Sequence, residues 1–384
     1  MVPLRLLHLA DLHVGKRVCD FPMLEDQRHA LSQVLDLLSG GTVDVLLVAG
    51  DLYDKSQPSS EAVALVDWFL SGVAATGVPA VVIPGNHDSA ERVAYAGSLL
   101  AREGVHMAPA FDGHIEPVVL EDEFGPVYVW PVPYLHPATI RHFLPDAKAD
   151  GYTDAFRSLV ESLPLDASAR NVAVVHQFVT AAGCTVERSD SEVSVGGLDN
   201  VDASVFDPFD YVALGHIHRP QRVGRDTMRY AGSLLKYSLS EADYDKSMPL
   251  VTLGRKGDEP TIDLLPVNPL HDLRRIRGPI DELLSSDVVG AQDANDYLHV
   301  VLTDESVEVN AMARLRNAYP NVMSITYDNA RTRAAGVHTD AVDAPVEASP
   351  LELFSRFYEE QNGKPLNEAQ LKIVRTELKG IEAM

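Results

Sequence analysis

Eight polar side chains able to bind metal ions or transfer protons follow short apolar runs at five places in the sequence. They are Asp11, His13, Asp51, Asn86, His87, His176, His216 and His218. Carboxylate, amide and imidazole ligands without thiolates are typical of Mn²⁺, Fe or Zn²⁺ in a reactive site, whereas structural zinc sites are rich in cysteine. Because a catalytic site for one metal needs about three protein ligands, this larger set predicts two divalent metals that act together at phosphorus.

Asp51 is the predicted bridge between the two metals. It is the lone acid at the end of the mostly apolar run at 43–48. A single anionic oxygen ligand shared by two cations reduces the repulsion between them. A chain that binds two metals this closely is therefore expected to place one carboxylate between them.

Two short motifs place ligands two residues apart, Asp11-Leu12-His13 and His216-Ile217-His218. Residues i and i+2 of an extended segment point the same way, so we expect both members of each pair to face the site. Glycines at 50, 85 and 215 are expected to let the backbone turn where larger side chains would crowd the ions. His8 lies inside its apolar run and is interpreted as a core or surface histidine.

Apolar runs of strand length must position these groups. The runs lie at 4–9, 43–48, 80–83, 172–175 and 211–214, and segments with helical spacing lie at 25–38, 60–75 and 154–162. Short runs without alternation indicate strands covered on both faces, and therefore an α/β fold. Ligands of open α/β sheets bind at the carboxyl ends of the strands, which is where these side chains fall.

The ordered motifs DLH, GDLYD, GNHD, H and GHIH, between residues 11 and 218, resemble those of the calcineurin-like metallophosphoesterases. The resemblance implies a layered α/β/β/α sandwich with a small appended α+β capping domain and C-terminal helices. It implies that one metal is held by Asp11, His13, Asp51 and His218, and the second by Asp51, Asn86, His176 and His216. It also implies that His87 is not a ligand but donates a proton to the leaving oxygen or steadies the transition state. Asp88 is expected to orient His87 through a hydrogen bond.

The sequences around the motifs resemble the bacterial nuclease subunits that work with the SbcC ATPase. The stretches are HLADLHVGK at 8–16, GDLYDKSQPS at 50–59, GNHDSAER at 85–92, ALGHIHRPQ at 213–221 and AGSLLKYSLSE at 231–241. This resemblance implies a nuclease dependent on two divalent ions, with Mn²⁺ expected. It implies cleavage of double-stranded DNA ends and hairpins within an SbcCD-type repair and recombination complex, as a homodimer.

The character of the chain changes after residue 267. We predict a nuclease domain at 1–267, a capping domain at 268–328, a linker at 329–349 and a helical segment at 350–384. The linker region is rich in Ala, Asp, Thr and Pro. Apolar residues of the last segment, among them Phe354, Phe357, Leu371 and Val374, are candidates for docking the SbcC coiled coil. The alternative is that they pack against the body of the same chain.

Net charge bears on the partners that the chain can have. The charge is −24, from 56 acidic and 32 basic residues, whereas a protein that binds DNA alone usually carries a basic face. Either the partner of this chain is not nucleic acid, or another subunit supplies the positive surface, or a local basic patch is hidden in the total. Arg17 and Arg92 lie beside the motifs and are candidates for contact with phosphate. The two cysteines are far apart, and the sequence shows neither a transmembrane run nor a secretory signal, so a cytoplasmic location is expected.

Two other functions stay open on the residues alone. A small-molecule or cyclic-nucleotide phosphodiesterase could use the same pair of metals, and hydrolysis of cyclic AMP rather than hairpin DNA would identify it. A repair scaffold whose metals are only structural is the alternative that is not an enzyme.

Overall fold

The computed structural model describes residues 3–147, 150–192, 199–306, 308–330, 332–333 and separate positions between 351 and 375. The chain divides into two compact units, Met1–Asp272 and Leu273–Met384, and each is described by itself. Apart from residues 329, 330, 332 and 333, the predicted linker lies outside the described residues. The same holds for Phe357 and for most of the predicted helical segment at 350–384.

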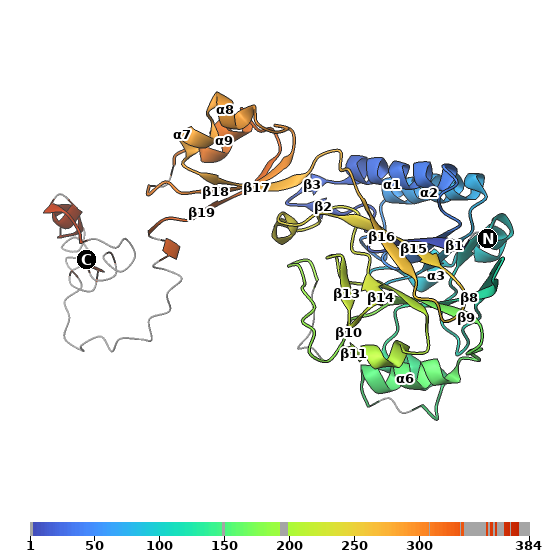
Figure 1. The fold of residues 1–384 in the computed structure, drawn as a ribbon. Helices are drawn as coiled ribbons and strands as arrows, with labels where there is room; N and C mark the ends of the chain where they lie inside the picture. The colour runs from blue at the N-terminus through green and yellow to red at the C-terminus, as the bar shows by residue number, and fades with distance from the viewer. Residues whose placement is uncertain are drawn as a thin grey trace. The chain divides into compact units, whose positions relative to one another are not determined.

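The first sheet of the first unit carries the N-terminal motifs. Its strands, in spatial order, are β16 (Thr261–Pro266), β15 (Ser247–Leu253), β1 (Leu4–Leu9), β4 (Val45–Ala49), β5 (Ala80–Ile83) and β6 (Val105–Met107). The last four strands in this order run parallel, while β15 and β16 pair antiparallel. Helices α1 (Leu24–Ser39) and α2 (Ser60–Thr76) provide two of the crossovers and cover the outer face of this sheet (Figure 1).

The second sheet carries the later motifs. Its strands, in spatial order, are β13 (Gln221–Val223), β14 (Arg225–Tyr230), β12 (Tyr211–Gly215), β9 (Arg170–His176), β8 (Gly125–Val132) and β7 (Val118–Asp122). The central strands β14, β12, β9 and β8 run parallel, and an antiparallel strand closes each edge. Helix α6 (Tyr152–Ser162) packs its apolar face on the outside of this sheet.

A hydrophobic core between the two sheets joins them into the expected α/β/β/α sandwich. Side chains such as Leu6 and Leu47 from the first sheet meet Val172 and Ala213 from the second, and all four are fully buried. Strands covered on both faces explain the unbroken apolar runs in the sequence. His8 also lies in this interior and is fully buried, with Nδ1 3.0 Å from the Tyr211 hydroxyl.

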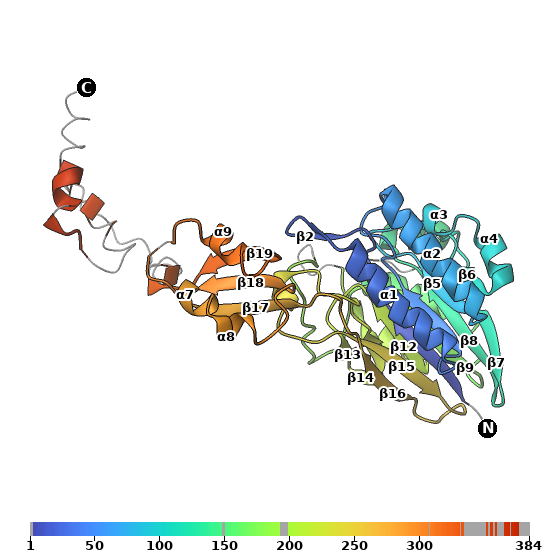
Figure 2. The ribbon, with the colours of Figure 1, turned by 90° about the horizontal axis from the view of Figure 1, so that it is seen from above.

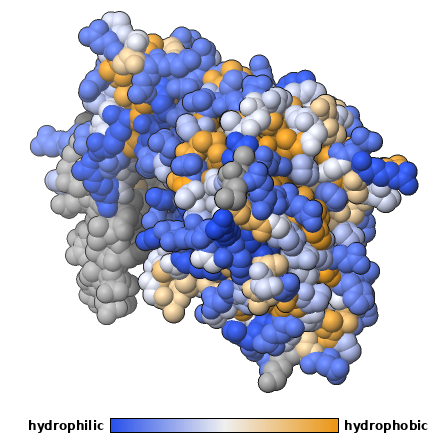
Figure 3. All heavy atoms as spheres, turned by 45° about the vertical axis from the view of Figure 1, so that its right-hand side comes forward, coloured by the Kyte–Doolittle hydropathy of each residue, from blue (hydrophilic) through white to orange (hydrophobic). Residues whose placement is uncertain are grey.

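Shorter elements complete the first unit. They are β2 (Arg17–Val18), β3 (Phe21–Pro22), β10 (Val179–Thr180), β11 (Val201–Asp202), α3 (Ala90–Val93), α4 (Gly97–Leu100) and α5 (Pro137–Phe143), with 3₁₀ turns at Ala101–Glu103, Ala203–Phe206 and Leu239–Glu241. Hydrophilic residues cover much of the face seen in Figure 3, with hydrophobic patches between them. No helix among the described residues combines the length and apolar character needed to cross a membrane.

The second unit contains a three-stranded parallel sheet in the order β17 (Leu273–Gly278), β18 (Tyr297–Leu302) and β19 (Val322–Tyr327) (Figure 2). Helices α7 (Ile280–Leu283), α8 (Ser286–Val289) and α9 (Ala311–Arg316) accompany it. Strand β17 is not among the apolar runs named above, because three of its six residues are arginines. It lies at an edge of the sheet, where Arg274 pairs with Asp296 and Arg277 with Asp328. Charged side chains at an edge discourage pairing with another chain.

Candidate metal centre

All eight predicted site residues lie in the first unit, at or just beyond the carboxyl ends of parallel strands. Asp11 and His13 follow β1, Asp51 follows β4, Asn86 and His87 follow β5, His176 ends β9, and His216 and His218 follow β12. Each sheet therefore contributes to one rim of the sandwich. The side chains of the eight residues meet at this rim.

The first predicted ligand set comes together around two histidines. The Nε2 atoms of His13 and His218 are 3.1 Å apart. Asp11, His13 and His218 offer ligand atoms that all lie within 4.8 Å of one another. His13 Nε2 is also 3.5 Å from Asp51 Oδ2.

The second predicted ligand set comes together around Asn86. Its side-chain oxygen lies 2.9 Å from His176 Nε2 and 3.0 Å from His216 Nδ1. His176 Nε2 is 3.4 Å from Asp51 Oδ2. The same oxygen of Asp51 thus lies within 3.5 Å of a nitrogen from each set, which is the position of a bridging ligand.

The donor set fits divalent cations. Asp11 and Asp51 are 0% and 2% exposed. Among the residues that the structure describes, neither carboxylate forms an ion pair with a lysine or an arginine. Buried carboxylates are costly unless a cation or hydrogen bonds compensate them, and bound metal ions would supply that charge.

Burial and proximity shift the pKa values of this cluster in opposite directions. Burial raises the pKa of Asp11 to about 6. Burial opposes ionisation of Asp51, but the neighbouring imidazoles outweigh it and lower the pKa of this carboxyl. Burial likewise disfavours the imidazolium of His176, but the charge of Asp51 raises its pKa to about 9, while burial and His176 lower the pKa of His216 to about 3. Without a metal, the site therefore keeps a proton on His176.

Metal binding at the second ligand set should weaken as the pH falls below about 9. His176, whose pKa Asp51 raises to about 9 despite burial, must lose its proton to bind a metal. Each pH unit below 9 is then expected to lower the affinity about tenfold. Calorimetric titration with Mn²⁺ at pH 7 and 8, in two buffers of different ionisation enthalpy, measures the affinity and the released proton. An affinity that is the same at both pH values would contradict the expectation.

Hydrogen bonds outside the ligand sets orient two of the imidazoles. His176 Nδ1 donates to the carbonyl of Ala49 at 2.8 Å, which leaves Nε2 for Asn86 and Asp51. His218 Nδ1 lies 2.9 Å from Ser191 Oγ and 3.3 Å from Glu241 Oε1. Such outer contacts fix the orientation and tautomer of metal-binding histidines.

Sequence reasoning missed the residues that support His218. Glu241 is 0% exposed and forms an ion pair with Lys246 at 2.6 Å. Glu192 Oε1 accepts from the backbone N–H of His218 at 2.6 Å. No spacing in the sequence marks these contacts, although Glu241 ends the stretch AGSLLKYSLSE.

The expected role of Asp88 is wrong. Its carboxylate accepts from the backbone N–H groups of Leu52, Tyr53 and Gly85 at 2.9–3.0 Å, so it braces two loops against each other. His87 Nδ1 instead donates to the backbone carbonyl of Asp54 at 2.9 Å. The contact to Asp54 uses Nδ1 of the His87 ring and leaves Nε2 available. The backbone N–H of His87 donates to Asp51 Oδ1 at 2.8 Å.

The expectation that the paired ligands lie on extended segments is also wrong. Strand β1 ends at Leu9 and β12 at Gly215, before either pair begins. Asp11, His13 and His216 have φ values of 52°, 43° and 103°. A residue with a Cβ held at such a positive φ costs on the order of 1–3 kcal/mol of stability, so tertiary contacts must hold these turns.

The three glycines are needed for the ligands themselves. A Cβ on Gly50 would lie 2.2 Å from His176 Nδ1, and one on Gly215 would lie 1.8 Å from the carbonyl of Ala49 in the opposite sheet. A Cβ on Gly85 would lie 2.2 Å from Asp51 Oδ1. Larger residues at these positions would displace ligands before any ion could bind.

Gly85→Ala should lower kcat by about 10²-fold, because displacement of a catalytic group by about 1 Å has effects of that size. We also expect the free energy of unfolding to fall by about 1–3 kcal/mol, as is usual for overpacking. Thermal unfolding and steady-state kinetics measure the two effects. Gly151→Ala is the matched control, since a Cβ there meets nothing within 4 Å. Wild-type values for Gly85→Ala would show that Asp51 moves without consequence.

This sandwich and its rim of carboxylate, amide and imidazole ligands define a metal-dependent phosphoester hydrolase. Residues 4–220 match the family model described as calcineurin-like phosphoesterase, and the chain belongs to that family. Residues 269–362 match a second model, SbcD_C, described as the type 5 capsule protein repressor C-terminal domain. Together, the two matches are consistent with an SbcD-type member of the metallophosphoesterase superfamily.

Two solved structures are similar over 70% of this chain and 100% of their own chains. One is the protein TT1561 of Thermus thermophilus, with 14% sequence identity and a TM-score of 0.40. The other is a dimetal phosphatase from Danio rerio, with 12% identity and a TM-score of 0.39. The family assignment depends on the match at 4–220, which covers more than half of the 384 residues.

Proposed function

We propose that this chain is the Mn²⁺-dependent nuclease subunit of an SbcCD-type DNA repair and recombination complex. It hydrolyses phosphodiesters at double-stranded DNA ends and in hairpins. The observation that carries the proposal is the position of Asp51 Oδ2, within 3.5 Å of a nitrogen from each ligand set. The match of residues 269–362 to SbcD_C supports the nuclease over other phosphoesterases.

In this proposal, the two ligand sets of the rim would hold two Mn²⁺ ions, and Asp51 belongs to both sets. The first set is Asp11, His13, Asp51 and His218, and the second is Asp51, Asn86, His176 and His216. When bound, such a pair of ions generates a nucleophile from water at neutral pH and stabilises the charge that develops at phosphorus. The chain itself supplies rigid strand ends that hold the ligands in place.

His87 is the proposed proton donor. Its Nδ1–H donates to the carbonyl of Asp54, so that Nε2 is available to the substrate, and the imidazolium form would carry on Nε2 the proton to be donated. As the oxygen of water bonds to phosphorus and releases one proton to solvent, the bond to the 3′ oxygen breaks and the proton of Nε2 passes to that leaving oxygen. His87 then recovers a proton from solvent. His87 is partly exposed, as a group that meets substrate must be.

The decisive experiment is a nuclease assay on a labelled DNA hairpin with Mn²⁺, with and without the SbcC subunit. Cleavage of the hairpin, without hydrolysis of cyclic AMP, is the expected result. Hydrolysis of cyclic AMP alone would support a small-molecule phosphodiesterase. A chain that binds metal and cleaves neither substrate would support the scaffold.

We further propose that the segment 350–384 docks the SbcC coiled coil, and that the chain is a homodimer in the complex. Among the described positions of this segment, Phe354 is 40% exposed and Ile373 is 63% exposed. Apolar side chains in water favour association with an amphipathic helical partner. With a net charge of −24, the chain leaves the basic track along DNA to that partner.

Deletion of residues 350–384 should abolish binding to SbcC while hydrolysis of bis-p-nitrophenyl phosphate continues at the wild-type rate. All eight site residues lie in Met1–Asp272, which the deletion leaves intact. Size-exclusion chromatography with light scattering measures complex formation, and a colorimetric assay measures hydrolysis. A truncated chain that still forms the complex would rule out this docking segment.

A further inference from the structure

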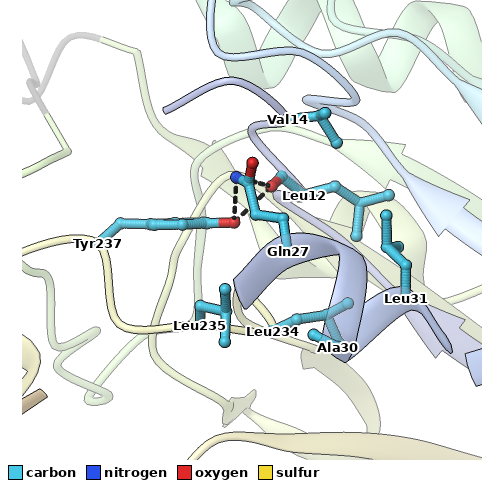
Figure 4. Close-up of a pocket in the computed structure, with 8 residues that line it drawn as sticks. All are labelled: Leu12, Val14, Gln27, Ala30, Leu31, Leu234, Leu235 and Tyr237. Carbon is cyan, nitrogen blue, oxygen red and sulfur yellow. Dashed lines mark hydrogen bonds between the residues drawn. The ribbon is translucent and has the colours of Figure 1, made fainter. Parts of the chain in front are cut away.

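The turn that carries His13 is held by two buried side chains, Gln27 and Tyr237, which meet at the carbonyl of Leu12 (Figure 4). Gln27, in the first turns of α1, donates through Nε2 to the carbonyls of His13 at 2.8 Å and Leu12 at 3.3 Å. Its Oε1 accepts from the backbone N–H of Gly15 at 3.0 Å. Tyr237 donates its hydroxyl to the carbonyl of Leu12 at 2.5 Å and lies 2.9 Å from Gln27 Nε2.

These hydrogen bonds are shielded from water. Gln27 is 2% exposed and Tyr237 is 4% exposed. The small apolar pocket beside them has walls formed by Val14, Ala30, Leu31, Leu234 and Leu235. Loss of Gln27 would remove the partner of the Gly15 N–H and one donor from the carbonyls of Leu12 and His13, and loss of Tyr237 would remove a donor from Leu12. A buried polar group that loses its partner costs about 1–3 kcal/mol.

The contacts hold a turn that the backbone does not favour. His13 has a φ of 43°, a left-handed conformation that is unfavourable for a residue with a Cβ. With negative φ, the imidazole would swing away from His218 Nε2 and Asp51 Oδ2, which now lie 3.1 and 3.5 Å from its own Nε2. Tyr237 adds ring contacts, because its centroid lies 5.8 Å from that of His13 and 6.0 Å from that of His218.

The second ligand set has its own supports. His176 is oriented by Ala49, and Asn86 lies between His176 and His216. The hydrogen bonds of Gln27 and Tyr237 given above reach Leu12, His13 and Gly15 instead. The two halves of the metal centre are thus supported by different contacts.

We propose that Gln27 and Tyr237 are positioning residues that set the metal affinity of the first ligand set alone. The inference rests on the proposed two-metal function and adds to it a separate control of one ion. Replacement of either residue would relax the turn at His13 and weaken the first ion, while the second ion stays bound. Outer contacts of this kind contribute about 10–100-fold to metal affinity.

The test compares two glutamines of the same helix in the full chain. Gln27→Met removes the contacts to the ligand turn. Gln33→Met removes a comparable pair of hydrogen bonds to Asn268, at 2.7 and 3.1 Å, in a loop without ligands. Titration calorimetry with Mn²⁺ gives both affinities, and electron paramagnetic resonance separates a spin-coupled ion pair from a single ion.

We expect Gln33→Met to bind two coupled Mn²⁺ ions as the wild type does. Gln27→Met should bind one ion with wild-type affinity and the other about 10–100-fold more weakly, with the spectrum of a single ion at low Mn²⁺. Tyr237→Phe, which keeps the ring, should show the same loss to a smaller extent and decides the question if Gln27→Met does not fold.

Three outcomes would overturn the inference. Unchanged affinities in Gln27→Met and Tyr237→Phe would remove the positioning role while leaving the two-metal function intact. Equal weakening of both ions would show a general loss of structure rather than control of one ion. A wild-type chain that binds fewer than two Mn²⁺ ions would overturn the proposed function and this inference with it.

Discussion

Asp51→Asn should lower kcat/KM for phosphodiester hydrolysis by about 10⁴-fold, because the metal pair supplies several kcal/mol of transition-state stabilisation and about 1.4 kcal/mol equals tenfold in rate. Asp51 Oδ2 lies between His13 and His176, at 3.5 and 3.4 Å from their Nε2 atoms. Asparagine keeps the shape of the side chain but removes the charge that both ions would share. The variant is therefore expected to bind at most one Mn²⁺ ion.

Asp44→Asn is the matched control, since Asp44 precedes the same strand β4 and pairs with Arg5 at a partly exposed position. Exposed ion pairs contribute about 0–1 kcal/mol, so this variant should keep wild-type kinetics. Steady-state kinetics and metal stoichiometry on both variants make the comparison. Two bound ions and near-wild-type hydrolysis in Asp51→Asn would exclude Asp51 as the bridge.

His87→Ala should lower kcat by about 10²–10⁴-fold, which is the usual contribution of a general acid, and leave the metal stoichiometry at two. In the ligand sets, His13 Nε2 lies close to His218 Nε2, and His176 Nε2 lies close to Asp51 Oδ2. His87 Nδ1 instead donates to the carbonyl of Asp54. Loss of the ring removes the proton donor without removing a ligand. The pH–rate profile of the residual activity should no longer show the loss of activity at high pH that deprotonation of a general acid causes.

His142→Ala replaces an exposed histidine of α5 and serves as the control for loss of an imidazole. Calorimetric titration with Mn²⁺ and hairpin cleavage should be measured on both variants. If His87→Ala cleaves DNA at the wild-type rate, His87 has no part in proton transfer. If it binds fewer ions than the wild type, His87 belongs to a ligand set.

Local patterns in the sequence were sufficient for the strands and for the residues at their ends. The runs at 4–9 and 211–214 became β1, Leu4–Leu9, and β12, Tyr211–Gly215. Burial on both faces leaves an unbroken apolar run, and the polar residue that ends the run marks the rim. Strand β17 was not predicted, because three of its six residues are arginines. A strand at the edge of a sheet tolerates such charges, whereas a central strand does not.

Longer-range features were beyond such patterns. Asp88 follows His87 directly, yet its carboxylate accepts from backbone N–H groups of two loops, Leu52 and Tyr53 in one and Gly85 in its own. The left-handed turn at His13 is supported by Gln27, 14 residues along the chain, and by Tyr237, which contacts Leu12 from 225 residues away. Hydrophobic periodicity in the sequence does not predict such contacts.

The sequence by itself therefore determined which side chains could bind metals and at the ends of which strands they would lie, since residue type and hydrophobic pattern are local properties. The tertiary structure alone decided which oxygen lies between the two sets and which contacts hold each ligand. Those features exist only when two sheets pack face to face, because the distance between side chains on different sheets depends on the packing of the core between them.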